Sequence, residues 1–454
     1  MSSLSLCMIV RDAQADLPAC LESVRGIVDE LVVADTGSRD ATTDVAKQYG
    51  ARVFSIPWEN DFARARNQSL AQVNTDWVLV LDADEQLGPD AAGALPPLLM
   101  QPEVAGYLVT IRNYVLNCNE RLWDRPAQPN HSNLPAARNF PAYMEHENVR
   151  LFRRHPEIYF VGRVHETVGS RILSKGMKLA RAGLLIHHFG MAANQEIRDR
   201  KNRLYRELGR LKVQEMPDNA QAHFELGLVE LDNFHNDAEA LACFERAWSL
   251  DPNLAVAWFF GAVAQGQLGR PAEALECVRR ARSLGHFPAL AAELEGDAHY
   301  NLGHFDAAVS CYQQAFRQSS ESATVESKLG LAETRAGLVQ AGTTRLSRAV
   351  ERQPTLPELH DRLIVANVWL GRLEQAAVAA ERKLEAVEPH PDQFLRAASI
   401  RARMGQNERA VVLLRRGLGL FPQAEKLRLC LAELMGEEAA RSALPPSGCE
   451  TVAS

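Results

Sequence analysis

The chain has 454 residues, of which 46% are hydrophobic and 24% are charged. Because this length exceeds what one hydrophobic core usually serves, and the composition is that of ordinary globular proteins, the sequence predicts two or three folded domains. A formal net charge of -7 provides no generally basic surface, which argues against nucleic acid as the main partner.

The start of the chain indicates a strand and not a targeting signal. Residues 1–10 are apolar, but no basic region precedes them, and Arg11 and Asp12 follow at once. No later segment approaches the roughly 20 apolar residues that a membrane-spanning helix needs. Eight cysteines without a close CxxC pair favour reduced thiols over a disulfide scaffold. We therefore expect a cytoplasmic protein without a transmembrane segment.

Short β-branched runs alternate with helical patterns from residue 4 to about residue 116. This alternation predicts a parallel sheet covered by helices. The expected strands are residues 4–10, 30–34, 51–56 and 77–81. Ligands of such sheets bind beyond the carboxyl ends of the strands, so the residues that follow each strand are the candidate site.

A polar turn follows the second expected strand. It reads Asp35-Thr36-Gly37-Ser38-Arg39-Asp40-Ala41-Thr42. Asp35 can accept hydrogen bonds from a nucleoside base or ribose, and Gly37 allows the backbone to turn closely. Ser38, Asp40 and Thr42 are residue types that cap helices, and capping is the role that we expect for them.

The fourth expected strand ends in two carboxylates, Asp82 and Asp84, followed by Glu85. Charge at the edge of a sheet costs free energy unless cations compensate it. A Mg²⁺ or Mn²⁺ ion that bridges a diphosphate provides this compensation, because hard oxygen ligands and phosphate oxygens share its coordination shell. A lone Asp-x-Asp is common by chance, so the position at a strand end is what predicts a metal site.

Four ordered motifs stand out in this region. They are Met8-Ile9-Val10-Arg11, Val33-Ala34-Asp35-Thr36-Gly37-Ser38-Arg39-Asp40, Asp61-Phe62-Ala63-Arg64-Ala65-Arg66-Asn67 and Trp77-Val78-Leu79-Val80-Leu81-Asp82-Ala83-Asp84-Glu85. The set resembles family 2 of the glycosyltransferases, in the bacterial branch that often carries tetratricopeptide repeats, over about residues 4–205. The resemblance implies a GT-A fold and inverting transfer from a nucleotide-diphospho-sugar, assisted by a divalent cation, Mn²⁺ or Mg²⁺.

The same resemblance implies roles for individual residues. Asp35 would contact the nucleoside, Asp82 the ribose or the metal, and Asp84 the metal. Arg66 and Asn67 lie in the Arg-Asn motif of the family beside the nucleotide, where a guanidinium can pair with phosphate. The alternative for Arg66 is an ion pair with a carboxylate on a helix surface.

Two later runs resemble further motifs of the same branch. They are Phe160-Val161-Gly162-Arg163-Val164-His165-Glu166 and Ile186-His187-His188-Phe189-Gly190. Inversion needs a carboxylate that takes the proton of the acceptor, and Glu166 is the candidate base, with a structural hydrogen-bond role as the alternative. His188 can complete the metal or diphosphate site through a neutral imidazole, and His187 is the weaker candidate. For His188 the alternative is a satisfied core histidine.

The polar stretch 117–147 is interpreted as a loop of the acceptor site. It contains Asp124, Glu145 and Glu147, which are further candidates for the base. A catalytic base must come within hydrogen-bond reach of the acceptor, so a loop with several carboxylates beside the site is a suitable source.

The second half of the chain is similar to about six tetratricopeptide repeats. Pro252, Pro354 and Pro422 are separated by multiples of 34 residues, the period of these helical hairpins. A small residue recurs at this spacing where two helices of a hairpin cross, at Ala247, Ala281, Ala315 and Ala349. Three cysteines also share the spacing, Cys243, Cys277 and Cys311. Equivalent positions lie a full hairpin apart, so we do not expect these thiols to share a zinc ion.

The predicted fold class is an α/β GT-A domain followed by an all-α solenoid. We expect the catalytic domain at 1–205, a linker helix at 206–216, the repeats at 217–436 and a disordered tail at 437–454. The predicted function is inverting, metal-assisted glycosyl transfer to a polypeptide, lipopolysaccharide or other glycan, with the acceptor engaged partly by the repeats. The alternative is an inactive transferase-like scaffold that binds protein partners through the repeats.

Overall fold

The computed structural model describes residues 2–116, 121–122, 125–190, 195–285, 287–319 and 322–436. Asp124 and the predicted tail at 437–454 lie outside these residues. The chain forms two compact units, Met1–Ala257 and Trp258–Ser454.

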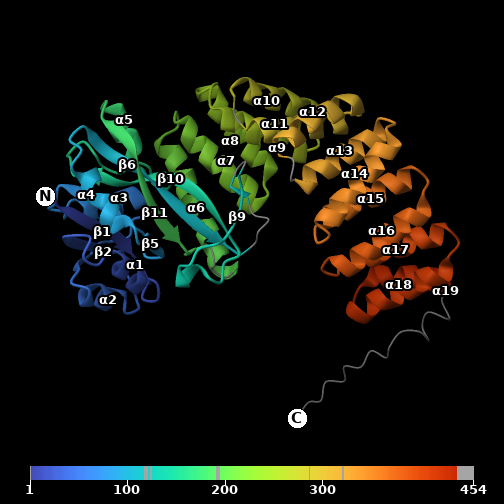
Figure 1. The fold of residues 1–454 in the computed structure, drawn as a ribbon, viewed down its shortest axis with the longest axis horizontal. Helices are drawn as coiled ribbons and strands as arrows, with labels where there is room; N and C mark the ends of the chain where they lie inside the picture. Colours follow the sequence, from blue (N-terminus) through green and yellow to red (C-terminus); the bar gives the residue numbers. More distant parts are fainter. Residues whose placement is uncertain are drawn as a thin grey trace, which may run out of the picture. The chain divides into compact units, whose positions relative to one another are not determined.

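A mixed sheet is the centre of the first unit (Figure 1). Its strands lie in the order β3-β2-β1-β4-β10-β6-β11-β5, and β9 pairs with β10. Their bounds are β1 (Leu4–Val10), β2 (Glu30–Asp35), β3 (Arg52–Ser55), β4 (Trp77–Val80), β5 (Glu85–Leu87), β6 (Val104–Val115), β9 (Gln128–Pro129), β10 (Ala142–Arg153) and β11 (Lys178–His188). A separate hairpin contains β7 (Arg121–Leu122) and β8 (Arg125–Pro126). The four predicted strands are confirmed to within one residue at each end.

Helices cover both faces of the sheet because the central strands are apolar on both sides. In β1, Leu6 packs with Leu17 and Leu95 in one core cluster, whereas its neighbour Cys7 packs with Ile172 in another. The helices are α1 (Leu17–Ser23), α2 (Thr42–Gln48), α3 (Phe62–Leu70), α4 (Ala91–Leu99), α5 (Gly169–Ser174), α6 (Gln195–Glu215), α7 (Ala220–Phe234), α8 (Asp237–Leu250) and the short 3-10 turn η1 (Pro135–Ala137). The predicted linker helix lies in α6, which begins earlier, at Gln195.

The expected acceptor loop at 117–147 is in part regular structure. Strand β10 lies between β4 and β6, antiparallel to both, so the end of the predicted loop is a central strand. The carboxylate of Glu145 accepts a hydrogen bond from Arg112 at 2.8 Å, and that of Glu147 accepts one from Arg181 at 2.8 Å. The interpretation as a single loop was therefore wrong, because residues far away in the sequence supply the strands that pair with β10.

The solenoid of helical hairpins follows, as predicted. Its further helices are α9 (Ala255–Gln267), α10 (Pro271–Ser283), α11 (Pro288–Asn301), α12 (Phe305–Gln318), α13 (Ala323–Arg335), α14 (Val339–Arg352), α15 (Pro357–Trp369), α16 (Leu373–Ala386), α17 (Pro391–Arg403), α18 (Asn407–Leu420) and α19 (Glu425–Met435). The alanines of the 34-residue column are fully or almost fully buried, at Ala247, Ala281, Ala315 and Ala349. In α16 the column holds Lys383, whose ammonium group donates to Asp361 at 2.7 Å.

Glycine is required where two helices of a hairpin touch, and Gly296→Ala tests this. A Cβ on Gly296 would lie 2.6 Å from Cε1 of Tyr312, whose hydroxyl is held by Asp297 at 2.7 Å. The ring would have to move, so we expect the free energy of unfolding to fall by about 1–3 kcal/mol. Urea unfolding followed by circular dichroism measures the change.

Gly266→Ala is the matched control for this measurement. Gly266 is also in a helix of the array, but a Cβ there would meet no atom within 4 Å. Alanine is the better helix former by roughly 0.8–1 kcal/mol, so this variant is expected to be as stable as the wild type or more stable. Equal losses in the two variants would contradict the packing argument.

Candidate active site

The carboxyl ends of three parallel strands bring the predicted site residues to one edge of the sheet. Strand β1 lies between β2 and β4, with Val10 opposite Asp35 and Cys7 opposite Val80. Asp35 ends β2, and Asp82 follows β4 by two residues, so both lie at the same edge. Figure 1 shows β1 and β2 side by side in the first unit. The topology therefore assembles the site from loops that are distant in sequence.

Asp35 is buried at this edge, with 5% of its surface exposed. Its carboxylate accepts hydrogen bonds from the backbone N–H groups of Gly37 at 3.2 Å and Ser38 at 3.1 Å. Gly37 has φ +106°, a conformation that side chains rarely adopt, which explains the glycine in this turn. The carboxylate thus fixes the shape of the turn that would receive a nucleoside.

The expected capping roles in this turn hold only for Asp40, whose Oδ1 accepts a hydrogen bond from the N–H of Thr42 at the start of α2, at 3.0 Å. The N-cap position itself is Ala41, which makes no side-chain capping bond. The three polar side chains also accept hydrogen bonds from the turn after β1, at the N–H groups of Asp12 (to Ser38), Gln14 (to Asp40) and Ala13 (to Thr42). Capping was expected from residue type alone, whereas the neighbouring loop supplies donors that the local sequence does not show.

A buried arginine joins two of the predicted site residues. Arg66, on α3, is 7% exposed. Its Nη2 donates to Oδ1 of Asp82 at 2.7 Å, and its Nε donates to Oε1 of Glu166 at 2.5 Å. Its Nη1 is buried and has no hydrogen-bond partner among the described residues. Neither partner of Arg66 is the helix-surface carboxylate considered from the sequence.

A second arginine, Arg150 on β10, was missed in the sequence. Its Nη2 donates to Oδ2 of Asp82 at 3.3 Å and to Oε1 of Glu85 at 2.7 Å. Partial burial on its own raises the pKa of Asp82, but the positive charges of Arg66 and Arg150 outweigh it and lower the pKa well below its usual range. Both oxygens of Asp82 therefore accept hydrogen bonds from arginines.

Glu85 is buried beneath the turn at Asp82 and holds this turn in place. It is 2% exposed, and its Oε2 accepts a hydrogen bond from the backbone N–H of Asp82 at 2.8 Å. Burial raises its pKa to about 7, against the opposing charge of Arg150. Its position beneath the loop assigns it to shaping the Asp82 turn.

Asp84 and His188 face each other across the edge of the sheet. Oδ2 of Asp84 lies 3.4 Å from Nε2 of His188, and Nδ1 of His188 lies 2.7 Å from Oδ1 of Asn113 on β6. With Nδ1 donating to Asn113, Nε2 is the nitrogen that faces Asp84, and neutral imidazole in this orientation can offer Nε2 to a metal ion. Burial lowers the pKa of His188, but the hydrogen bond and charge of Asp84 outweigh it and raise the pKa.

Gly190 keeps the space between these two side chains open. A Cβ on Gly190 would lie 2.7 Å from Nε2 of His188 and would also overlap Oδ2 of Asp84. The chemistry of the pair, a carboxylate oxygen and an imidazole nitrogen, suits a divalent cation. His187 points to the other side of β11, where its Nδ1 lies 2.8 Å from the hydroxyl of Tyr114, and burial lowers its pKa to about 4. The residues present therefore fit a metal at Asp84 and His188.

Asn67 holds the backbone of Phe160 in place through two hydrogen bonds. Its Nδ2 donates to the carbonyl of Phe160 at 2.9 Å, and its Oδ1 accepts from the N–H of Phe160 at 2.8 Å. This reciprocal pair fixes the start of the segment that carries Glu166. In the Arg-Asn motif, Arg66 thus pairs with the carboxylates of Asp82 and Glu166, whereas Asn67 holds the neighbouring loop in place.

Glu166 lies at the edge of a group of ion pairs that also contains Arg66, Asp82, Arg150 and Glu85. Its side chain is 12% exposed, and Arg66 occupies one of its carboxylate oxygens. The other oxygen, Oε2, has no hydrogen-bond partner among the residues that the structure describes. A carboxylate with one held and one open oxygen has a fixed orientation and keeps a lone pair for a proton.

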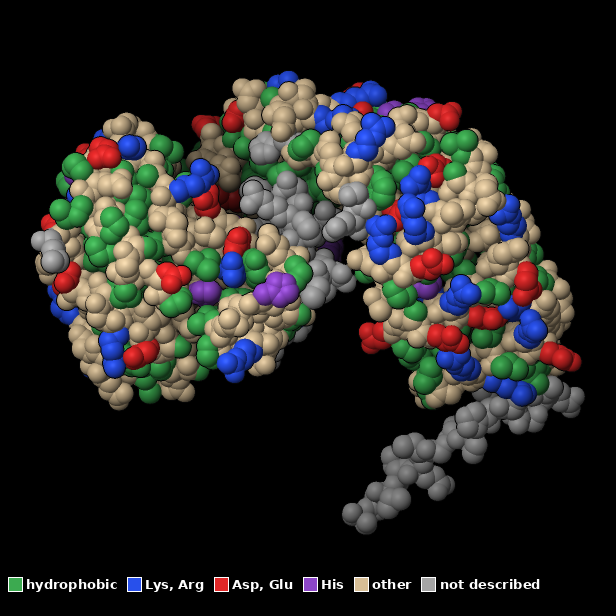
Figure 2. Space-filling model, viewed as in Figure 1, with side chains coloured by type: hydrophobic (Ala, Val, Ile, Leu, Met, Phe, Trp, Pro, Cys, Tyr) green, Lys and Arg blue, Asp and Glu red, His purple; other side chains and the backbone are tan. Residues whose placement is uncertain are grey.

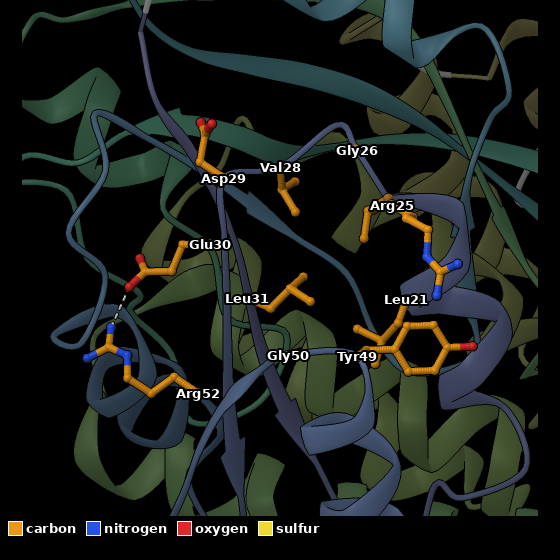
Figure 3. A pocket seen from close by; sticks show the side chains of 11 residues that line it. Leu21, Arg25, Gly26, Val28, Asp29, Glu30, Leu31, Tyr49, Gly50 and Arg52 are labelled. Atoms are coloured by element: carbon orange, nitrogen blue, oxygen red, sulfur yellow. Dashed lines mark hydrogen bonds and ion pairs between the residues drawn. The ribbon is translucent and has the colours of Figure 1, made fainter.

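A cavity of about 340 Å³ lies at the opposite end of the sheet from these residues (Figure 3). Glu30 in its lining begins β2, whereas Asp35 ends the same strand. The carboxylate of Glu30 pairs with Arg52 at 2.7 Å, as the dashed line in the figure shows. The cavity therefore does not include the residues at the carboxyl edge.

Another group of possible metal ligands lies in the second unit, at Glu295, His299 and Cys311. The two oxygens of Glu295 already pair with Arg279 and Arg282. Two guanidinium charges beside the carboxylate oppose a cation there, so we interpret the group as packing and ion pairing. Cys243 and Cys277 are not part of this group.

The surface of the array carries both signs of charge. On the face shown in Figure 2, acidic and basic side chains are interspersed over the C-terminal helices. Among the described residues, no helix is long and apolar enough to cross a membrane. The visible surface chemistry thus does not select one class of partner.

Each half of the chain contains a segment that matches a known protein family. Residues 5–158 match the model of glycosyl transferase family 2, and residues 292–321 match a tetratricopeptide repeat. A TPR repeat-containing protein of Synechococcus elongatus is 40% identical over 174 residues, 38% of this chain and 37% of that protein. An uncharacterized glycosyltransferase of Rickettsia felis is 36% identical over 90 residues, 20% of this chain and 31% of that protein. The matches span about a third of each of these relatives.

Two further matches are more distant. The glycosyltransferase SunS of the SPbeta prophage of Bacillus subtilis is 23% identical over 161 residues, 35% of this chain and 33% of that protein. Among solved structures, a tetratricopeptide repeat protein from Parabacteroides merdae has a TM-score of 0.43 and 15% identity, over 53% of this chain and 94% of that chain.

The mixed sheet and its carboxylate edge thus lie mainly in the region that matches the family 2 model, and a helical-repeat solenoid follows it. Residues 5–158 are similar to glycosyl transferase family 2, and residues 292–321 of the solenoid are similar to a tetratricopeptide repeat.

Proposed function

We propose that this chain transfers a sugar from a nucleotide-diphospho-sugar to an acceptor, with inversion at the anomeric carbon and with a divalent cation. The observation that carries the proposal is the meeting of two pairs at the carboxyl edge of a family 2 domain. One is the Asp84 and His188 pair, and the other is the Arg66 and Glu166 pair. The first pair can bind a cation. In the second pair the carboxylate of Glu166 can take the proton of the acceptor.

The donor is proposed to bind along the edge from β2 to β4. Asp35 shapes the turn for the nucleoside, and the guanidinium charge of Arg66 at the same edge attracts the diphosphate. Asp82 is then a residue that orients the two arginines beside the diphosphate, because both of its oxygens accept from them. We accordingly propose Asp84 and His188, before Asp82, as the metal ligands.

When bound, Mn²⁺ or Mg²⁺ would neutralise negative charge that develops on the departing diphosphate. Glu166 is proposed as the base, with Oε2 as the atom that receives the proton of the acceptor. The acceptor oxygen or sulfur forms its bond to the anomeric carbon as the bond from that carbon to the diphosphate oxygen breaks. The nucleoside diphosphate leaves with the electron pair, and attack from the opposite face inverts the configuration.

The acceptor is proposed to be a polypeptide that the repeats engage in part. Stacked helical hairpins form extended surfaces that bind peptides and protein segments. The mixed charge of the array in Figure 2 is compatible with hydrogen bonding to such a segment.

Gly190→Ala tests the proposed metal site. The new methyl would occupy the space between Asp84 and His188, so we expect the affinity for Mn²⁺ to fall by at least about 10-fold, the range seen when groups supporting a metal ligand are lost. Titration of Mn²⁺ by electron paramagnetic resonance, with uridine diphosphate present, measures the affinity. Gly93→Ala, where a Cβ meets no atom within 4 Å, should bind Mn²⁺ like the wild type. Unchanged affinity in Gly190→Ala would place the metal elsewhere.

The activity itself is tested by the release of nucleoside diphosphate. The full chain is incubated with uridine, guanosine and thymidine diphospho-sugars in Mn²⁺, Mg²⁺ or EDTA, since many transferases hydrolyse their donor slowly without an acceptor. We expect release from one donor that stops in EDTA. If no donor is turned over and none raises the melting temperature, the inactive scaffold becomes the better explanation.

A further inference from the structure

The segment that carries Glu166 is a short, tightly closed loop. Val161 and Thr167 bond each other through both backbone groups at 3.1 Å and close the loop at its base. Within it Gly162 has φ +97° and His165 has φ +52°. His165 is not a glycine, so its left-handed backbone persists only because the surroundings hold it. The position of Glu166 therefore depends on what holds residues 162–165.

Helix α6 and the first repeat helix hold this loop from outside the matched transferase region. Lys212 is 7% exposed, and its Nζ donates to the carbonyl of Val164 at 2.9 Å and to Oε2 of Glu225 on α7 at 2.6 Å. The same Nζ lies 3.3 Å from where a Cβ on Gly162 would be, so the glycine admits the ammonium group.

Further contacts from α6 reach the loop on both sides of Val164. Arg163 forms an ion pair with Glu215 and donates to the carbonyl of Asn60 at 2.8 Å. The ring of Tyr205 packs edge-on against that of His165, with centroids 5.8 Å apart. Each residue from 163 to 165 is thus contacted by a side chain of α6.

We propose that Lys212 is a positioning residue for Glu166, and that α6 with α7 forms a brace which couples the first repeat hairpin to catalysis. A buried ammonium group must satisfy its donors, and Val164 and Glu225 are the two acceptors that the structure provides. Because Val164 is two residues from Glu166, loss of the ammonium releases the backbone that aims the carboxylate. The proposal rests on the proposed function for its catalytic part and on geometry for the rest.

Lys212→Met in the full chain tests the brace with two readouts. Hydrogen exchange of the amides from residue 161 to 167, measured without ligand, should become faster. With the donor that the wild type turns over, kcat should fall by about 10- to 100-fold while KM for the donor changes less than about twofold, because small displacements of a reacting group cost up to about 10²-fold. Lys212→Arg should recover most of kcat, since a guanidinium can donate to both acceptors.

Two further variants keep the test decisive. Glu225→Gln leaves the bond to Val164 but removes the countercharge, so it should change both readouts in the same direction by a smaller factor, and it serves if Lys212→Met does not fold. The Lys426→Met variant changes an exposed lysine on α19 and should match the wild type.

Unchanged kcat in folded Lys212→Met, or an equal fall in Lys426→Met, overturns the proposal. A wild-type chain that turns over no donor overturns the proposed function instead, and the exchange rates then still decide whether α6 holds the loop.

Discussion

Asp84→Asn is expected to reduce kcat/KM for donor turnover by about 10²- to 10³-fold, the loss seen when one preorganised electrostatic group is removed from an active site. Asparagine keeps the size of the side chain and can still accept from His188, but it has lost the negative charge that attracts a cation. The remaining turnover should respond little to EDTA. Release of nucleoside diphosphate with and without Mn²⁺ measures both effects.

Asp90→Asn is the matched control for this substitution. Asp90 precedes α4, is exposed, and makes no side-chain capping bond, so the same change should leave turnover and its metal dependence unaltered. If Asp84→Asn keeps full metal-dependent activity, Asp84 is not a metal ligand. In that case Asp82, despite its two arginine partners, would be the carboxylate to test next.

The strands that form the carboxyl edge could be predicted from the sequence. Two apolar, β-branched runs, of six and four residues, lead to the carboxylates of Asp35 and Asp82. Because the carboxyl ends of parallel strands meet at one edge, the sequence predicts that these carboxylates lie at the same edge. The repeat period likewise placed the buried alanines, because a crossing of two helices tolerates only a small side chain there. These features depend on local pattern and on periodicity, which a single sequence displays.

The antiparallel insertion could not be predicted in the same way. Strand β10 pairs with β4 and β6, and nothing local shows that a polar stretch becomes a central strand. Arg150 lies on that strand, and no local pattern indicates its pairing with Asp82. Lys212 was missed for a similar reason, since a lysine on a charged helix looks solvated until the loop beside it is known. Long-range pairing, and not residue type, decides these roles.

Glu166→Gln is expected to reduce kcat by about 10²- to 10⁴-fold, the usual contribution of a general base. Glutamine can still accept from Nε of Arg66 through its carbonyl oxygen, so the bridge from Arg66 to Asp82 remains. What is lost is the capacity of the second oxygen to take a proton. Binding of the donor and of Mn²⁺, measured by calorimetry, should therefore stay within about twofold of the wild type while turnover falls.

This separation of binding from turnover distinguishes Glu166 from the metal ligands and from the brace. Asp84→Asn should weaken metal binding, and Lys212→Met should loosen the loop, whereas Glu166→Gln should do neither and still be inactive. Glu207→Gln, an exposed glutamate on α6, should retain full turnover as the matched control. If Glu166→Gln stays active, its carboxylate is only the acceptor that fixes Arg66, and the base must be sought among other carboxylates that reach the edge of the sheet.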